Sequence, residues 1–126
     1  MTNGFLLIKY CLLVIFIAYF VSIKPAYSTV INSGTTNTST LIDSLVEFTG
    51  NGTLQVNSSY NLAGNISTNA NGVGTINFST TNTLTVGSSS VVGSIGASNL
   101  QLNNINFDQD GTLNVYGNVY ANTIPN

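Results

Sequence analysis

Residues 83–107 read TLTVGSSSVVGSIGASNLQLNNINF, and this stretch decides the fold. Its first four residues, TLTV, recur as TLQV at 53–56 and as TLNV at 112–115. The Ile-Asn-Phe that ends the stretch also occupies 76–78, and Val-Glu-Phe occupies 46–48, so both motifs return at nearly the same spacing. Recurrence at a fixed period of about thirty residues is the sequence signature of a repeat architecture.

Each unit contains three short segments in which apolar and polar residues alternate between Gly, Asn and Ser. Period-two alternation of Val, Ile, Leu, Phe and Thr is typical of β-strands. Equal strands repeated at a fixed spacing favour stacked coils, in which like residues lie ~4.8 Å apart. The sequence therefore predicts an all-β fold, a right-handed parallel β-helix with one coil for each repeat. Four inward ladders are expected: Leu54, Leu84 and Leu113; Val56, Val86 and Val115; Phe48, Phe78 and Phe107; and Ile66, Ile95 and Ile124.

An antiparallel β-sandwich is the alternative fold. About one hundred residues of short strands suffice for a sandwich. Asn-Gly at 51–52 and 71–72 and Asp-Gly at 110–111 are typical hairpin turns. A sandwich, however, gives no reason for the ladders to recur at a constant step, so the β-helix is the preferred prediction.

The body of the chain, residues 29–126, contains no Lys, Arg, His or Cys, and almost half of it is Asn, Ser or Thr. Its charged side chains are four carboxylates, Asp43, Glu47, Asp108 and Asp110. A body without basic groups cannot neutralise phosphates, which excludes nucleic acid as a partner. The usual transition-metal ligands and cysteine nucleophiles are missing too. We expect a protein that is not an enzyme, with no catalytic residue and no cofactor.

Residues 1–28 are apolar and contain an uncharged run, 10–23, between two lysines. The length of this run fits the apolar region of a secretory signal peptide. Ala26 and Ser28 place small residues where a signal peptidase requires them, which predicts cleavage between Ser28 and Thr29. The inner-membrane translocon is then a partner, and the product is exported to the periplasm, the cell surface or outer membrane, or the medium. The alternative is an uncleaved anchor of a small single-pass membrane protein of unknown role.

The organisation expected from these observations has three parts. Residues 1–28 are the signal peptide, 29–40 are a Ser/Thr/Asn-rich linker, and 41–126 are the β-helical repeats. The third unit is incomplete, because the chain ends before the next I-x-F segment.

Two groups of side chains are candidates for binding. Asp108 and Asp110 resemble half of a calcium loop, but Thr112 stands at the fifth position and no distal Glu follows, so they are weak metal candidates beside a simple turn. Tyr60, Tyr116 and Tyr120 are candidates for an exposed aromatic patch that binds glycan or protein. Packing within strands is the favoured interpretation of these tyrosines.

The segment NTLTVGSSSVVGSIGASNLQLNNINF (82–107), with GTLQV before it and GTLNV after it, resembles the passenger-domain repeats of rickettsial autotransporter surface antigens, outer membrane proteins A and B. The likeness covers about 48–126. It implies a β-helical stalk at the cell surface that contributes to adhesion, with a host-cell surface protein or glycan as partner. The chain lacks the translocator barrel of that family, so the resemblance implies a passenger fragment, structural or adhesion-related, of a split or truncated gene.

Overall fold

The computed structural model describes residues 27–125, which form short β-strands and one 3-10 turn, with no α-helix among them. Alternation of one inward and one outward residue runs through most strands, as in TLQV and TLTV. The elements are β1 (Ser28–Ile31), β2 (Thr35–Asn37), η1 (Thr38–Thr40), β3 (Leu45–Phe48), β4 (Thr53–Val56), β5 (Tyr60–Leu62), β6 (Ile66–Thr68), β7 (Val73–Phe78), β8 (Thr83–Val86), β9 (Leu102–Phe107), β10 (Thr112–Val115) and β11 (Ala121–Thr123).

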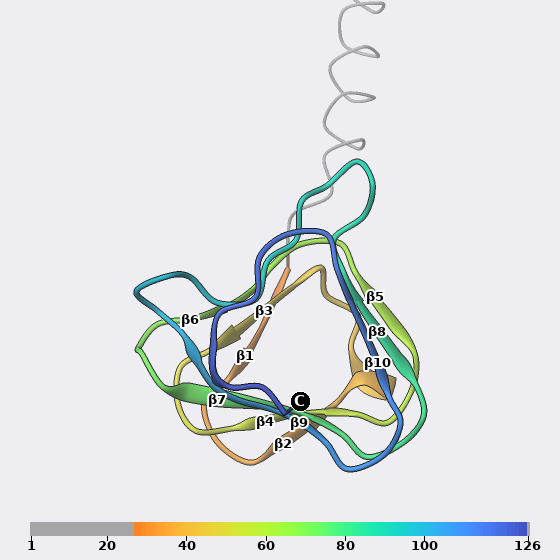
Figure 1. The fold of residues 1–126 in the computed structure, drawn as a ribbon, viewed down its shortest axis with the longest axis horizontal. Helices are drawn as coiled ribbons and strands as arrows, with labels where there is room; N and C mark the ends of the chain where they lie inside the picture. The colour runs from red at the N-terminus through yellow and green to blue at the C-terminus, as the bar shows by residue number, and fades with distance from the viewer. Residues whose placement is uncertain (1–26, 126) are drawn as a thin grey trace, which may run out of the picture.

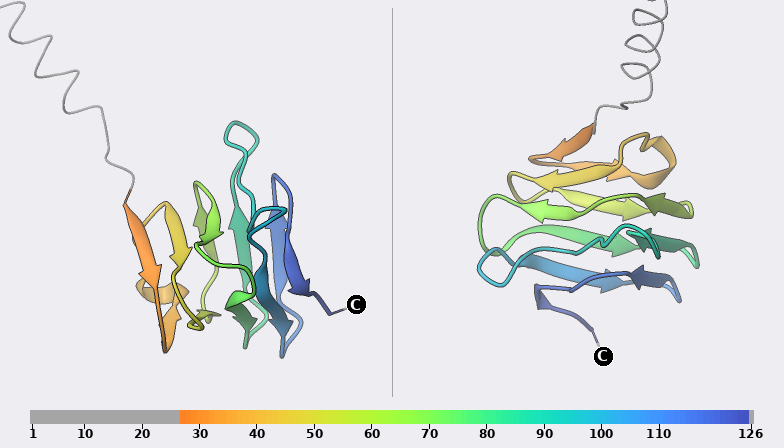
Figure 2. Two further views of the ribbon diagram at one scale, coloured as in Figure 1. Left: turned by 90° about the vertical axis from the view of Figure 1, so that its left-hand side faces the viewer. Right: turned by 90° about the horizontal axis from the view of Figure 1, so that it is seen from above.

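The strands pair into three sheets. Sheet A has the order β1-β3-β6, sheet B the order β11-β9-β7-β4-β2, and sheet C the order β10-β8-β5. Within residues 27–125, all pairings between these strands are parallel. The chain therefore circles a common interior and contributes to the sheets in turn, so that successive turns stack (Figures 1 and 2). The all-β prediction is confirmed, and the antiparallel sandwich is wrong, because a sandwich needs antiparallel neighbours.

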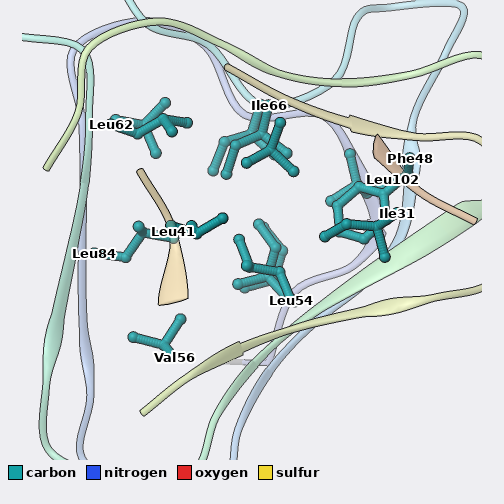
Figure 3. Packing of buried hydrophobic residues seen from close by; sticks show 14 of the residues in the cluster. Ile31, Leu41, Phe48, Leu54, Val56, Leu62, Ile66, Leu84 and Leu102 are labelled. Atoms are coloured by element: carbon teal, nitrogen blue, oxygen red, sulfur yellow. The ribbon is translucent and has the colours of Figure 1, made fainter. Parts of the chain in front are cut away.

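Inward side chains of the three sheets meet in one apolar core (Figure 3). Each fully buried Val, Leu, Ile or Phe contributes about 1.5–3 kcal/mol relative to exposure, so this set of apolar side chains is the main stabilising feature. The core consists of Ile31, Leu41, Val46, Phe48, Leu54, Val56, Leu62, Ile66, Ile76, Phe78, Leu84, Val86, Ile95, Leu102 and Ile105.

Part of the expected ladders is present. In sheet C, TLTV lies directly against TLNV, and the side chains pair at the predicted step. Phe78 pairs with Phe107 in sheet B at the same step. The confirmed neighbours are Leu84 with Leu113, Val86 with Val115, Phe78 with Phe107, and Ile66 with Ile95.

The position predicted for TLQV is wrong. Leu54 and Val56 point inward as expected, but β4 belongs to sheet B and pairs with Ile76 and Phe78 of β7. The neighbour of TLTV on that side is β5, whose Leu62 pairs with Val86. TLQV thus lies in a different sheet from the other two copies of its motif. The reason is that the coil from Thr53 in β4 to its partner Thr75 in β7 is distinctly shorter than the thirty-residue repeat.

The positions predicted for Phe48 and Ile124, the outer members of the two remaining ladders, are also wrong. Phe48 lies in sheet A between Ile31 and Thr68, and does not stack on Phe78. Ile124 follows β11 and is 48% exposed. The position beside Ile95 that was predicted for Ile124 is taken by Val119.

The linker predicted at 29–40 is wrong as well. Residues 28–37 form β1 and β2, the first strands of sheets A and B, and η1 follows directly. The turns also vary in length: Thr35 pairs with Thr53, whereas Thr75 pairs with the much more distant Asn104. A constant thirty-residue coil is therefore wrong for most of the stack. The extra residues of the longer turns lie at the surface, where insertions cost least.

Candidate functional surfaces

Asp108 and Asp110 lie in the turn between β9 and β10, and both side chains are exposed. Asn106 Nδ2 donates to Asp108 Oδ1 at 2.8 Å, and Gly111 N donates to Gln109 O at 2.7 Å, which closes the turn. Within residues 27–125, no group of three or more His, Cys, Asp or Glu side chains is arranged to hold a metal ion. The same turn lines an open hollow of about 380 Å³, formed by Phe107, Asp108, Gln109, Asp110, Gly111 and Pro125.

The expected cleavage residues, Ser28 and Thr29, begin β1 and pair with Leu45 and Val46 of β3. Thr29 Oγ1 donates a hydrogen bond to Asp43 Oδ2. The predicted signal peptide itself lies outside the described residues, apart from its last two positions. Among residues 27–125 no helix is long and apolar enough to cross a membrane.

The three candidate tyrosines have different surroundings. Tyr60, in β5, packs partly against the core, and its hydroxyl donates to the backbone oxygen of Asp43 at 2.8 Å. Burial, and then the negative charge of Asp43, raise the pKa of Tyr60 above its ordinary value. Tyr116 follows β10 and is 52% exposed, whereas Tyr120 is partly buried. Packing is thus the role of Tyr60, and Tyr116 is the most exposed of the three.

A ladder of side-chain amides runs across the outer surface of sheet B. Gln55, Asn77 and Asn106 are register partners on β4, β7 and β9. Asn77 Nδ2 donates to Gln55 Oε1 at 3.1 Å, and Asn106 Nδ2 donates to Asn77 Oδ1 at 2.8 Å. The ladder ends at Asp108, which accepts the second bond of Asn106. Neutral amides therefore tie three turns together on the solvent side.

A second surface, residues 87–93 (GSSSVVG), is a loop that the sequence did not single out as a site. It projects beyond the outline of the sheets (Figures 1 and 2). Gly87 has a φ of +83°, and a side chain there would overlap the backbone of Gly93, so the two glycines allow the base of the loop to close. Val91 and Val92 are 47% and 72% exposed. The signal in the sequence is a pair of glycines around three serines and two valines.

The comparisons with known proteins give no relative from which a role for these surfaces can be taken. No family model, no curated protein and no solved structure is detectably similar to this chain.

Proposed function

We propose that this chain is an exported, non-enzymatic surface protein of the autotransporter-passenger type, which builds a right-handed parallel β-helix and presents its outer surface to a host cell. The observation that carries the proposal is the parallel pairing of all three sheets around one core. Parallel strands that return to the same sheet after each turn are what a β-helical stalk requires. The resemblance of 82–107 to rickettsial passenger repeats supports the same assignment.

The outer surface favours a structural or adhesive role. The strands turn Thr, Asn and Gln side chains outward, and the body carries no cationic side chain and only four carboxylates. Such a surface binds through hydrogen bonds and local apolar contacts, since long-range steering of charged ligands needs a patch of one sign.

The loop at 87–93 is the proposed contact with a host-cell surface protein or glycan. Val91 and Val92 place two exposed apolar side chains next to each other on a surface that is rich in Asn, Ser and Thr. Exposed apolar groups with polar neighbours are typical of interaction sites. Ser88 fixes the loop, because its Oγ accepts from Val91 N at 3.1 Å and its backbone N donates to Val91 O at 2.7 Å.

The experiment expresses the full chain in a Gram-negative host and asks first whether the processed protein leaves the cytoplasm. The exported protein is then labelled, incubated with cultured animal cells and measured by flow cytometry. We expect saturable binding that falls at least several-fold in Val91→Ser/Val92→Ser. Ile42→Ser is the matched control, since Ile42 is 92% exposed in another part of the stack. Retention in the cytoplasm, or cell binding that is absent or insensitive to the loop variant, contradicts the proposal.

A further inference from the structure

The segment between η1 and β3 places the carboxylate of Asp43 against β1, the first strand of the fold. Asp43 Oδ2 accepts a hydrogen bond from Thr29 Oγ1 in β1, and the Asp43 backbone oxygen accepts one from the Tyr60 hydroxyl in β5 at 2.8 Å. The side chain of Asp43 is partly buried. Its position is therefore fixed from two sides, by the first strand of sheet A and by the first strand of sheet C.

No residue from 29 to 126 offers a basic side chain to this carboxylate. Residues 29–126 contain no Lys, Arg or His, and the nearest other charge along the chain is a second carboxylate, Glu47, on β3 opposite Val30. A partly buried carboxylate ordinarily has a cation or several donors beside it. Among the described residues, one threonine hydroxyl donates to the Asp43 side chain.

We propose that Asp43 is the binding site for the α-ammonium group that leader cleavage creates at Thr29. Cleavage hydrolyses the Ser28–Thr29 peptide bond: water supplies the oxygen that leaves as the Ser28 carboxylate, and the Thr29 nitrogen becomes a protonated amine. The inference rests on the export that is part of the proposed function. It adds a role for the amino terminus that cleavage creates.

The covalent structure of threonine brings that nitrogen close to the carboxylate. In threonine the α nitrogen and Oγ1 are separated only by Cα and Cβ, so a carboxylate that binds the hydroxyl stands next to the amine. The pairing of Thr29 with Val46 and of Ile31 with Phe48 holds the rest of β1 in place during this change.

Processing also removes a contact that the new pair replaces. In the unprocessed chain Leu45 N donates to Tyr27 O at 3.3 Å, and Tyr27 leaves with the leader. A hydrogen bond between an ammonium and a carboxylate is stronger than one between neutral groups. The first turn therefore gains an ion pair, through the only cation of the processed body, where it loses the contact of Tyr27.

The absence of lysine from the processed chain makes the test specific. The exported protein is treated with ¹³C-formaldehyde and a mild reductant, which methylates its single amine and keeps the positive charge. NMR then follows the ¹³C signal with pH, in the folded protein and in urea. We expect the folded protein to titrate about one pH unit above the urea-unfolded protein, since an opposite charge favours the protonated amine.

Asp43→Asn is expected to bring the amine back to the ordinary α-amino range of about 7.7–8.0. Asp108→Asn is the control: it also removes one carboxylate, but at the β9–β10 turn, and is expected to change nothing. The inference is overturned if the amine of the wild-type protein has the same pKa when folded and when unfolded, a comparison that does not depend on the folding of any variant.

Mass spectrometry of the exported chain separates this inference from the proposal on which it rests. A mature terminus at Thr29 is the expected result. An exported chain that begins at any other residue overturns the pairing with Asp43 and leaves the exported β-helix standing. A chain that is never exported overturns both.

Discussion

The ring of Phe78 stacks on the ring of Phe107, with centroids 4.5 Å apart and planes inclined by 8°. The two residues are register partners on β7 and β9, so the stack follows the spacing of the strands. Phe78 is fully buried, and Gly111 lies so close that a side chain there would press on the ring. Phe107 remains partly exposed. The two members of one stack therefore differ in how much apolar surface they bury.

Phe78→Ala is expected to lower the free energy of unfolding by about 3–5 kcal/mol, because it removes a large side chain and leaves a cavity. Phe107→Ala should cost distinctly less, since part of its ring is already in water. Urea unfolding followed by circular dichroism measures both. Tyr116→Ala, at an exposed aromatic residue, should change stability by no more than about 0.5 kcal/mol. Equal losses of stability at the two phenylalanines would contradict the difference in burial between their rings.

The sequence predicts which side of each strand faces the core, but not to which sheet the strand belongs. Leu54 and Val56 are buried as expected, although their strand lies in sheet B and not beside Leu84 and Val86. All three sheets surround the same core, so each accepts an alternating segment such as T-L-x-V. Sheet membership follows from the length of each turn, and the surface segments that set this length carry no apolar pattern.

The hydrogen bonds that complete the fold were not predictable from composition. Thr38 lies in the segment expected to be a linker, yet it is 1% exposed. When only residue types are known, a polar side chain is expected to face solvent. In the fold, the Thr38 hydroxyl takes the place of water as a hydrogen-bond partner for the backbone of a neighbouring turn. The members of the amide ladder on sheet B depend on the register between β4, β7 and β9, whose spacing along the chain is not constant.

Thr38→Val tests the buried hydroxyl. Thr38 Oγ1 accepts from Asn57 N at 3.2 Å and from Ser58 N at 3.1 Å, and it donates to Ser58 O at 2.8 Å. Valine keeps the shape and removes these bonds, although Asn57 N keeps a second acceptor, Gln55 O, at 3.1 Å. The loss costs about 1–3 kcal/mol for each buried group that water does not reach. Thr38→Ser should retain most of the stability, and the exposed Thr112→Val is the control. Unfolding midpoints in urea decide the matter, and a stable Thr38→Val protein speaks against the bonds.

Gly74→Ala and Gly34→Ala form a matched pair at a positive φ. Both glycines have a left-handed backbone conformation, with φ of +83° and +71°, so alanine costs about 1–2 kcal/mol at each. A side chain at Gly74 would also overlap the Phe48 ring, whereas nothing lies within 4 Å at Gly34. We expect Gly74→Ala to lose about 3 kcal/mol or more and Gly34→Ala to lose only the backbone term. Thermal unfolding of the two proteins would show equal losses if the corner beside Phe48 were loosely packed.

Asn77→Ala interrupts the amide ladder at its centre. Asn77 bonds Gln55 on one side and Asn106 on the other, so the substitution removes two hydrogen bonds between turns. A net loss of about 1–2 kcal/mol is expected, because the partly exposed amides regain water as a partner. Asn114→Ala is the control, since Asn114 is an exposed asparagine on the outer surface of sheet C and has no part in the ladder. Hydrogen exchange of β7 and β9 amides should quicken in Asn77→Ala alone.

Tyr60 makes the stability of the fold sensitive to alkaline pH. Burial raises the pKa of its phenol, and the nearby carboxylate of Asp43 raises it further, above the ordinary value of 10.0. Because the pKa is higher in the folded chain, the unfolded chain loses this proton first as pH increases. The contribution to stability is therefore complete below about pH 10 and is lost as pH rises through the folded pKa.

Tyr60→Phe is expected to cost about 0.5–1.5 kcal/mol at neutral pH, through the lost bond to the Asp43 backbone, and to flatten the alkaline decline. Urea midpoints across this range measure both effects, and Tyr116→Phe, at a tyrosine that is half exposed, should leave the decline unchanged. A decline of the same steepness in Tyr60→Phe assigns the alkaline sensitivity to another group.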